Sequence, residues 1–199
     1  MTQTSKLSTR TLVLGAILTA LVFLLQYMGS FIRLGPFSIS LVLIPIVIGA
    51  ATCGTGIASW LGLVFGFAVL ISGDAAAFLA VTVPGTFVTV LSKGVLCALL
   101  ASLTYKASLK VFAKLKNGRY LAVITAAIVC PIVNTGVFLI CCAVFFMDTM
   151  VEWAAAANLG GNVVHYMIFV LVGVNFIAEL VTNIVLSPIV SRLIDIRNK

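Results

Sequence analysis

Charged residues are scarce in this chain of 199 residues: they make up 9% of it, whereas hydrophobic residues make up 62%. A soluble domain carries roughly a quarter charged residues, so the polar side chains here are too few to cover a surface in contact with water. This balance argues against an ordinary soluble domain and predicts a polytopic membrane protein. We expect residues 1–199 to form a single integral membrane domain.

The signatures of several enzyme and metal-protein classes are also missing. The sequence contains no GxxxxGK[ST] phosphate loop and no HExxH motif, and His165 is its single histidine. Its five cysteines show no CxxC or zinc spacing and lie in or beside apolar runs, where cysteine packs as a small hydrophobe. We therefore expect a protein that is not an enzyme and has no metal site and no cofactor.

Positive charge is concentrated in a central loop, KASLKVFAKLKNGR, at residues 106–119. This loop holds five cations and no acid, and cationic loops of membrane proteins stay in the cytoplasm. No basic patch with interleaved aromatic residues accompanies the net charge of +7, so we expect the lipid bilayer rather than nucleic acid as its partner.

Six apolar segments approach the length of about 20 residues that a membrane-spanning helix needs. They lie at residues 9–29, 37–53, 56–73, 84–105, 120–147 and 162–193. The predicted fold is therefore an all-α bundle of six transmembrane helices with both termini in the cytoplasm. This topology places ten of the 12 cations inside; the exceptions are Arg33 in an outer loop and Lys93 within the fourth helix.

Three outer loops follow from this topology, at residues 30–36, 74–83 and 148–161. The second, DAAAFLAVTV, is too apolar for a solvated loop and too short to span the membrane. We expect it to fold back over the bundle, since irregular backbone at that depth must be buried in protein or line a cavity.

Polar residues inside the predicted helices mark where a solute could bind. Lys93 lies near mid-membrane, where a cation needs a partner or a cavity. It either forms a structural pair with Glu179 or serves as counter-ion for an anionic ligand. Asn134 follows Pro131, which frees a backbone carbonyl, and either bonds a neighbouring helix or contacts a ligand.

The sixth predicted segment carries two polar sets with helical spacing. Asn158, Asn162 and His165 share one face if the helix begins early enough, whereas Asn175, Glu179 and Asn183 share another. For Asn175 and Asn183 we favour packing. The resulting pocket opens outward and has no charged ring of a conducting pore. The candidate substrate-binding residues are Arg33, Asp74, Lys93, Asn134, Asn158, Asn162 and His165.

The first helix carries a face of small residues. Ala16 and Ala20 lie four residues apart, a spacing that lets two helices approach closely in lipid. They either contact another helix of the same chain or dock onto a separate membrane subunit. The third helix offers a second small face with Ala58, Gly62 and Gly66.

With these features the chain resembles the substrate-binding S components of energy-coupling factor (ECF) vitamin transporters. Residues 39–51, followed by a glycine-rich turn and residues 60–66, are similar to the branch that binds folate, pantothenate and riboflavin. The resemblance implies a receptor in the bacterial plasma membrane that binds a vitamin outside. It also implies a membrane scaffold subunit and two ATPase subunits as partners, with Ala16 and Ala20 facing the scaffold.

The resemblance leaves several substrates open. Pantothenate comes first, because its single carboxylate could pair with Lys93, Arg33 or His165. The pocket is expected to be poor in aromatic residues, with Trp153, Tyr166 and Phe78 nearest, and flat ligands such as folate or riboflavin favour more stacking surface. Folate, riboflavin or another small metabolite are the alternatives. A stand-alone secondary transporter, with Glu179 coupling protons, is a further one.

Overall fold

The computed structural model describes residues 8–30, 41–159 and 162–197, and every regular element among them is helical. The prediction of an all-α fold is thus confirmed for these residues. In chain order the elements are α1 (Thr9–Gly29), α2 (Leu43–Thr52), α3 (Thr55–Ile71), α4 (Ala76–Leu79), α5 (Val83–Val111), α6 (Gly118–Phe145), α7 (Met147–Ala156), α8 (Val163–His165), the π-helix η1 (Tyr166–Leu171) and α9 (Gly173–Arg197).

Four of the described helices are long and apolar enough to cross a membrane: α1, α5, α6 and the Gly173–Arg192 part of α9. The apolar helices α2 and α3 are shorter, at 10 and 17 residues. At 1.5 Å per residue α2 is only about 15 Å long, but the predicted second span begins at residue 37, outside the described residues. The count of six spans therefore stays a prediction.

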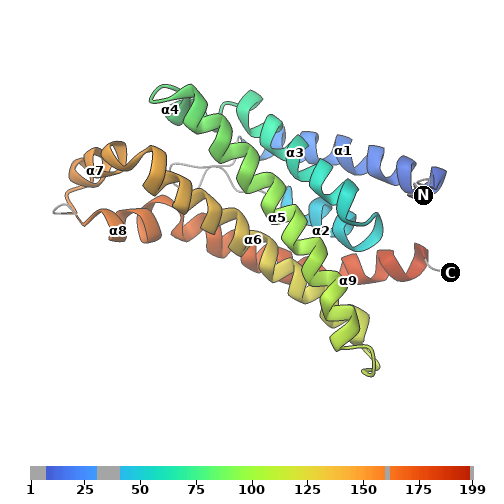
Figure 1. Cartoon of the computed structure of the whole chain (residues 1–199). Coiled ribbons are helices and arrows are strands. Elements are labelled where there is room, and N and C mark those ends of the chain that lie inside the picture. Colours follow the sequence, from blue (N-terminus) through green and yellow to red (C-terminus); the bar gives the residue numbers. More distant parts are fainter. Residues whose placement is uncertain (1–7, 31–40, 160–161, 198–199) are drawn as a thin grey trace, which may run out of the picture.

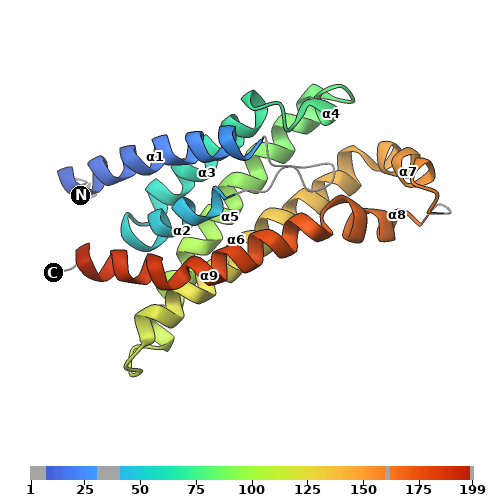
Figure 2. The same cartoon turned by 180° about the vertical axis from the view of Figure 1, so that it is seen from behind.

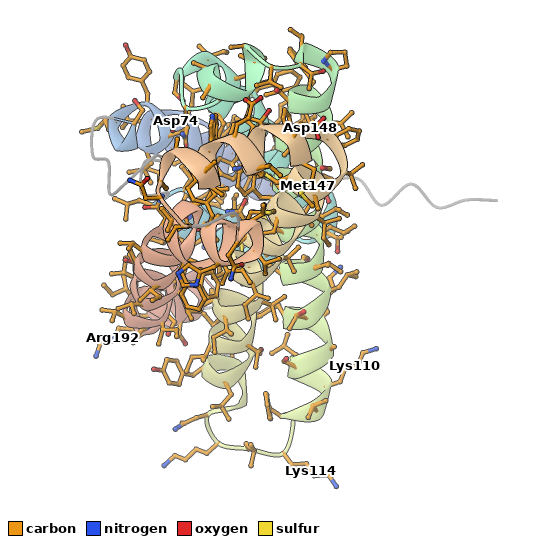
Figure 3. The ribbon with its side chains drawn as sticks, turned by 90° about the vertical axis from the view of Figure 1, so that its left-hand side faces the viewer. Asp74, Lys110, Lys114, Met147, Asp148 and Arg192 are labelled. Carbon is orange, nitrogen blue, oxygen red and sulfur yellow. The ribbon has the colours of Figure 1, made fainter. Side chains whose placement is uncertain are left out.

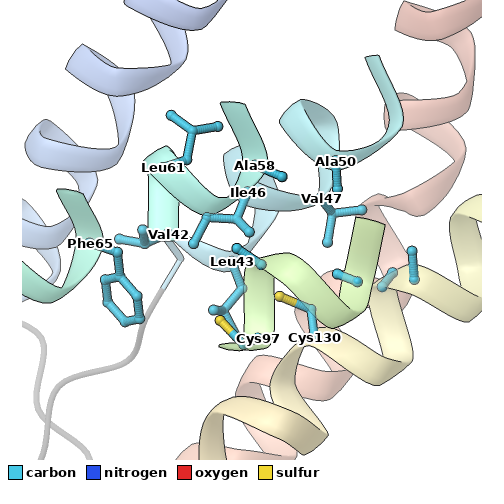
Figure 4. Packing of buried hydrophobic residues seen from close by; sticks show 14 of the residues in the cluster. Val42, Leu43, Ile46, Val47, Ala50, Ala58, Leu61, Phe65, Cys97 and Cys130 are labelled. Carbon is cyan, nitrogen blue, oxygen red and sulfur yellow. The ribbon is translucent and has the colours of Figure 1, made fainter. Parts of the chain in front are cut away.

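The antiparallel helices α5 and α6 form the centre of the bundle (Figure 1). Helix α3 packs along α5, α1 lies outside α2 and α3, and α9 packs along α6 on the opposite side (Figure 2). The main apolar core fills the space among α2, α3, α5 and α6 (Figure 4), where Leu43, Ile46, Leu61 and Phe65 are fully buried.

Glycines allow the backbones of α3 and α5 to touch. A Cβ atom added to Gly62 would lie 2.1 Å from the carbonyl oxygen of Gly94, and one added to Gly66 would lie 2.9 Å from a methyl of Leu91. Ala58 is buried on the same face. The small face of the third predicted helix is therefore used for packing within the chain.

The connections and short helices of the described residues lie at two opposite ends of the bundle. Both ends of the traced chain and the α5–α6 connection lie at one end of the bundle, and α4, α7 and α8 lie at the other (Figure 1). Viewed from the side, Lys110 and Lys114 lie far from Asp74 and Asp148 (Figure 3). The basic loop and the three short helices therefore occupy opposite ends of the molecule.

Three expectations about the loops need correction. The predicted basic loop, 106–119, is shorter in the structure, because α5 continues to Val111 and α6 begins at Gly118. The predicted third outer loop, 148–161, is mostly helix α7, because Met150 and Ala154 lie one turn apart and both bury completely. The predicted sixth helix does not begin early enough to carry Asn158, whose φ of 57° places it in the left-handed conformation just after α7. Asn158 therefore shares no helix face with Asn162 and His165.

Candidate functional site

A cavity lies among the ends of the helices on the α4 side of the bundle. It has a volume of about 70 Å³, whereas one water molecule needs roughly 10–15 Å³ by the same measure. It is lined from α1, α3, α4, α5, α6 and α9 and from the turn before α4, with the polar side chains of Gln26, Asp74, Thr86, Thr89, Lys93, Asn134, Thr135, Asn175 and Glu179. Polar groups of four helices and a turn thus converge on one hollow between apolar helices.

Phenylalanine rings form much of the apolar wall. Phe78, Phe138, Phe146 and Phe176 line the cavity. The ring centroid of Phe78 lies 5.6 Å from that of Phe138, 4.9 Å from that of Phe146 and 5.5 Å from that of Trp153. The expectation of a pocket poor in aromatic residues is therefore wrong. Phe78 of α4 packs against Phe138 of α6, and the sequence does not predict this contact because the two residues lie far apart along the chain.

Lys93 enters the cavity from α5 between two aromatic rings. Its Nζ atom lies 5.6 Å from the ring centroid of Phe65 and 5.3 Å from that of Phe138, which is within the range of cation–π attraction. Glu179 and Asp74 line the same cavity as Lys93. Lys93 was predicted either to pair with Glu179 or to serve as counter-ion for an anionic ligand. Both roles stay predictions, because Lys93 lines the cavity together with Glu179.

Asp74 reaches the cavity through a turn that only a few residue types can form. Gly73 lies in the turn that follows α3 and has a φ of 86°, a conformation that glycine adopts without strain. The Nε2 of Gln26 donates to Oδ2 of Asp74 over 2.6 Å and to Oγ of Ser72 over 3.4 Å. Gln26 is 2% exposed and ties the end of α1 to this corner. We did not select Gln26 from the sequence, although an amide deep in an apolar run was a usable signal.

Two asparagines bring unsatisfied hydrogen-bonding groups to the cavity. Asn134 on α6 is 5% exposed and Asn175 on α9 is 7% exposed. The Oδ1 of Asn134 and both terminal atoms of Asn175 are buried without a hydrogen-bond partner. The sequence favours packing for Asn175, whereas the structure places it at the cavity, shortly after η1. A Cβ on Gly173 would lie 3.0 Å from the carbonyl oxygen of Ile168, so this glycine permits the tight passage from η1 into α9.

Three other predicted substrate-binding residues are not brought to this cavity. Asn158, Asn162 and His165 are exposed and absent from its lining. Asn162 caps α8 by accepting from the backbone N–H of His165, and the His165 ring lies against Phe169, with 4.8 Å between ring centroids. Arg33 lies outside the described residues. The cavity therefore unites Asp74, Lys93 and Asn134 of the predicted set.

The predicted docking residues lie on the outer face of α1. Ala16 and Ala20 are exposed, whereas their neighbours Gly15, Leu18 and Val22 are buried toward α2 and α3. Thr19 accepts a hydrogen bond from Nε1 of Trp60 over 3.2 Å. The two alanines are thus free of the packing that holds α1 to the chain.

The described residues hold no cluster of three or more His, Cys, Asp or Glu side chains that could bind a metal ion. All five cysteine thiols are free.

Comparison with known protein families places the chain in a transporter family. The family described as "ECF transporter, substrate-specific component" matches residues 10–194, nearly the whole chain. Neither a curated protein nor a solved structure matches the chain significantly.

Proposed function

Because the chain belongs to the family of ECF transporter substrate-specific components, we propose that it captures a small vitamin outside the cell and delivers it to the cytoplasm. The family consists of transporter components rather than enzymes. The match and the four apolar spans make the chain a multi-pass membrane protein. The observation that carries the proposal is the cavity around Lys93, where polar groups converge between apolar helices as solute binding requires.

The cavity, on this proposal, opens to the outside of a bacterial plasma membrane. It lies at the α4 end of the bundle, whereas the basic 106–119 loop lies at the opposite end. Cationic loops stay in the cytoplasm, so this loop and both termini are placed inside. We treat residues 1–199 as one membrane domain in this arrangement.

Pantothenate is the first ligand to test. Its carboxylate suits the Lys93 ammonium, and its hydroxyl and amide groups suit the threonines and asparagines of the lining. The four phenylalanines also provide stacking surface for flat ligands. Folate, riboflavin and other small metabolites therefore stand as alternatives, and aromatic content does not rank them below pantothenate.

The chain, on this proposal, obtains its energy from an ECF module of a membrane scaffold subunit and two ATPase subunits. Family membership implies a small-molecule substrate and an ECF module. Exposed Ala16 and Ala20 support α1 as the docking helix, because small residues allow another helix to approach closely. Glu179, 5% exposed and at the cavity, favours the alternative of a proton-coupled secondary transporter.

One experiment in cells tests both parts of the proposal. Wild type and the Ala16→Leu/Ala20→Leu double variant are purified from rich medium for native mass spectrometry, and uptake of the retained ligand is then measured. We expect both proteins to retain the same ligand and only wild type to support uptake. The matched control is Ala143→Leu, an exposed alanine of α6.

Two results would contradict the proposal. Wild-type protein that retains and binds no small molecule would remove the receptor function. Uptake by isolated wild-type protein in vesicles, abolished by an uncoupler, would favour the secondary transporter instead.

A further inference from the structure

Asn134 and Asn175 carry the side-chain atoms that the structure shows buried at the cavity without a hydrogen-bond partner. Three of their terminal atoms, Oδ1 of Asn134 and Oδ1 and Nδ2 of Asn175, are buried without a partner. A buried polar atom left unpaired is costly, so proteins pair nearly all such atoms. Both side chains line one cavity from helices that pack together, α6 and α9.

The charged groups of the cavity have neighbours of other kinds. Asp74 accepts from Gln26, and the Nζ of Lys93 lies against two aromatic rings. The side-chain atoms that are buried at the cavity without a partner belong to neutral amides. An amide ends in one oxygen and one nitrogen, so the two asparagines together offer both donors and acceptors.

From this juxtaposition we infer that the substrate carries a neutral group with a carbonyl oxygen and an N–H close together, such as an amide, lactam or imide, which pairs with Asn134 and Asn175. This inference rests on the proposed function. Without substrate, water can satisfy the asparagines, because the cavity has room for it. A ligand that expels this water must replace its hydrogen bonds or lose affinity. The substrate therefore needs groups that pair with the two asparagines, whether or not water occupies the cavity before it binds.

Replacement by leucine separates this role from a structural one. Removing the unpaired amide in Asn134→Leu or Asn175→Leu should leave the Tm of ligand-free protein at or above that of wild type. Binding should weaken by about tenfold or more for each variant. The control is Asn183→Leu on the same helix: Asn183 is 3% exposed, but its Nδ2 already donates to the carbonyl oxygen of Glu179 over 2.8 Å. This variant should lower the Tm and retain the ligand-induced shift.

The probes are pantothenate, folate and riboflavin, each of which carries such a group, and an ester analogue of pantothenate in which oxygen replaces the amide N–H. Thermal shift and calorimetry on the full chain in detergent measure binding. Loss of affinity in both asparagine variants, and for the ester analogue if pantothenate binds, supports the inference.

The outcomes distinguish the inference from the function on which it rests. Unchanged affinity in both asparagine variants would overturn the inference and leave the receptor function standing. The same holds if the ligand retained by wild-type protein lacks any carbonyl and N–H group. A wild-type protein that retains no ligand and binds no probe would overturn the proposed function, and the inference with it.

Discussion

Lys93 illustrates what a single residue contributes to this site. Its Nζ lies over the rings of Phe65 and Phe138, and the carboxylate residues Glu179 and Asp74 line the same cavity. A cation inside an apolar bundle costs several kcal/mol unless such partners are present. The neighbours of Lys93 come from α3, α6, α9 and the α3–α4 turn, so its setting depends on the assembled fold.

We expect Lys93→Met to weaken binding of the substrate by about 1–3 kcal/mol, because a polar partner is removed while the length of the side chain is kept. Calorimetry with the ligand identified by mass spectrometry measures the effect. Lys110→Met, an exposed lysine in the last turn of α5, is the control and should bind as wild type does. Equal affinity in both variants would remove Lys93 from the site.

Sequence reasoning identified some site residues and missed others for a physical reason. Asp74, Lys93 and Asn134 were selected because a charge or an amide in or beside an apolar run is costly unless it has a partner. Asn175 carries the same signal but was assigned to packing, since its contacts depend on the break between η1 and α9. Gln26 was not selected at all.

At the scale of elements, the crossing of α3 and α5 depends on the absence of side chains. Gly62 and Gly94 meet through their backbones, and a Cβ on Gly94 would lie 2.3 Å from the carbonyl oxygen of Gly62. The obstructing atoms belong to backbone, so the two helices must separate to accept any larger residue. This crossing borders the cavity, because Val69 of α3 and Lys93 of α5 line it.

We expect Gly62→Ala and Gly94→Ala each to destabilise the protein by about 1–3 kcal/mol, the usual cost of overpacking a filled interior. Thermal unfolding in detergent provides the measurement. Gly136→Ala in α6 is the matched control: nothing lies within 4 Å of an added Cβ there, and alanine is the better helix former. A control as unstable as the other two variants would contradict the explanation by close packing.

The short helices show where periodicity alone was insufficient. Residues 148–161 were expected to form a loop, yet Met147–Ala156 is helical because Met150 and Ala154 pack against the aromatic cluster around Phe78. The apolar segment 74–83 was expected to fold over the bundle, and Phe78 within it is 4% exposed. Its apolar composition was informative, whereas the identity of its partners was not available from local sequence.

At the scale of the whole molecule, the distribution of charge sets the orientation that we propose. Lys110 and Lys114 of the basic segment lie far from Asp74 and from Met147 and Asp148 at the start of α7 (Figure 3). We expect Ala155→Cys in α7 to react with an impermeant thiol reagent in intact cells. Ala113→Cys in the basic loop should react only after the membrane is permeabilised. Both positions are exposed, so access to the reagent depends on the side of the membrane.

The background for this labelling is the wild-type chain, whose five thiols are buried or half-buried. Strong labelling of Ala113→Cys in intact cells, with none of Ala155→Cys, would invert the orientation. The cavity would then face the cytoplasm, and the proposed direction of capture would be wrong.

The sequence by itself determined the class of the protein and predicted its helical fold. A chain with 9% charged residues and long apolar segments belongs in lipid, where the hydrogen bonds of the backbone must be made within the protein. It also indicated three cavity residues, since a polar group at depth is expensive wherever it lies. Only the tertiary structure decided which polar groups converge, that four phenylalanines wall the cavity, and that two asparagines remain unpaired within it. These features arise from contacts between helices far apart in the chain, and local composition does not encode such distances.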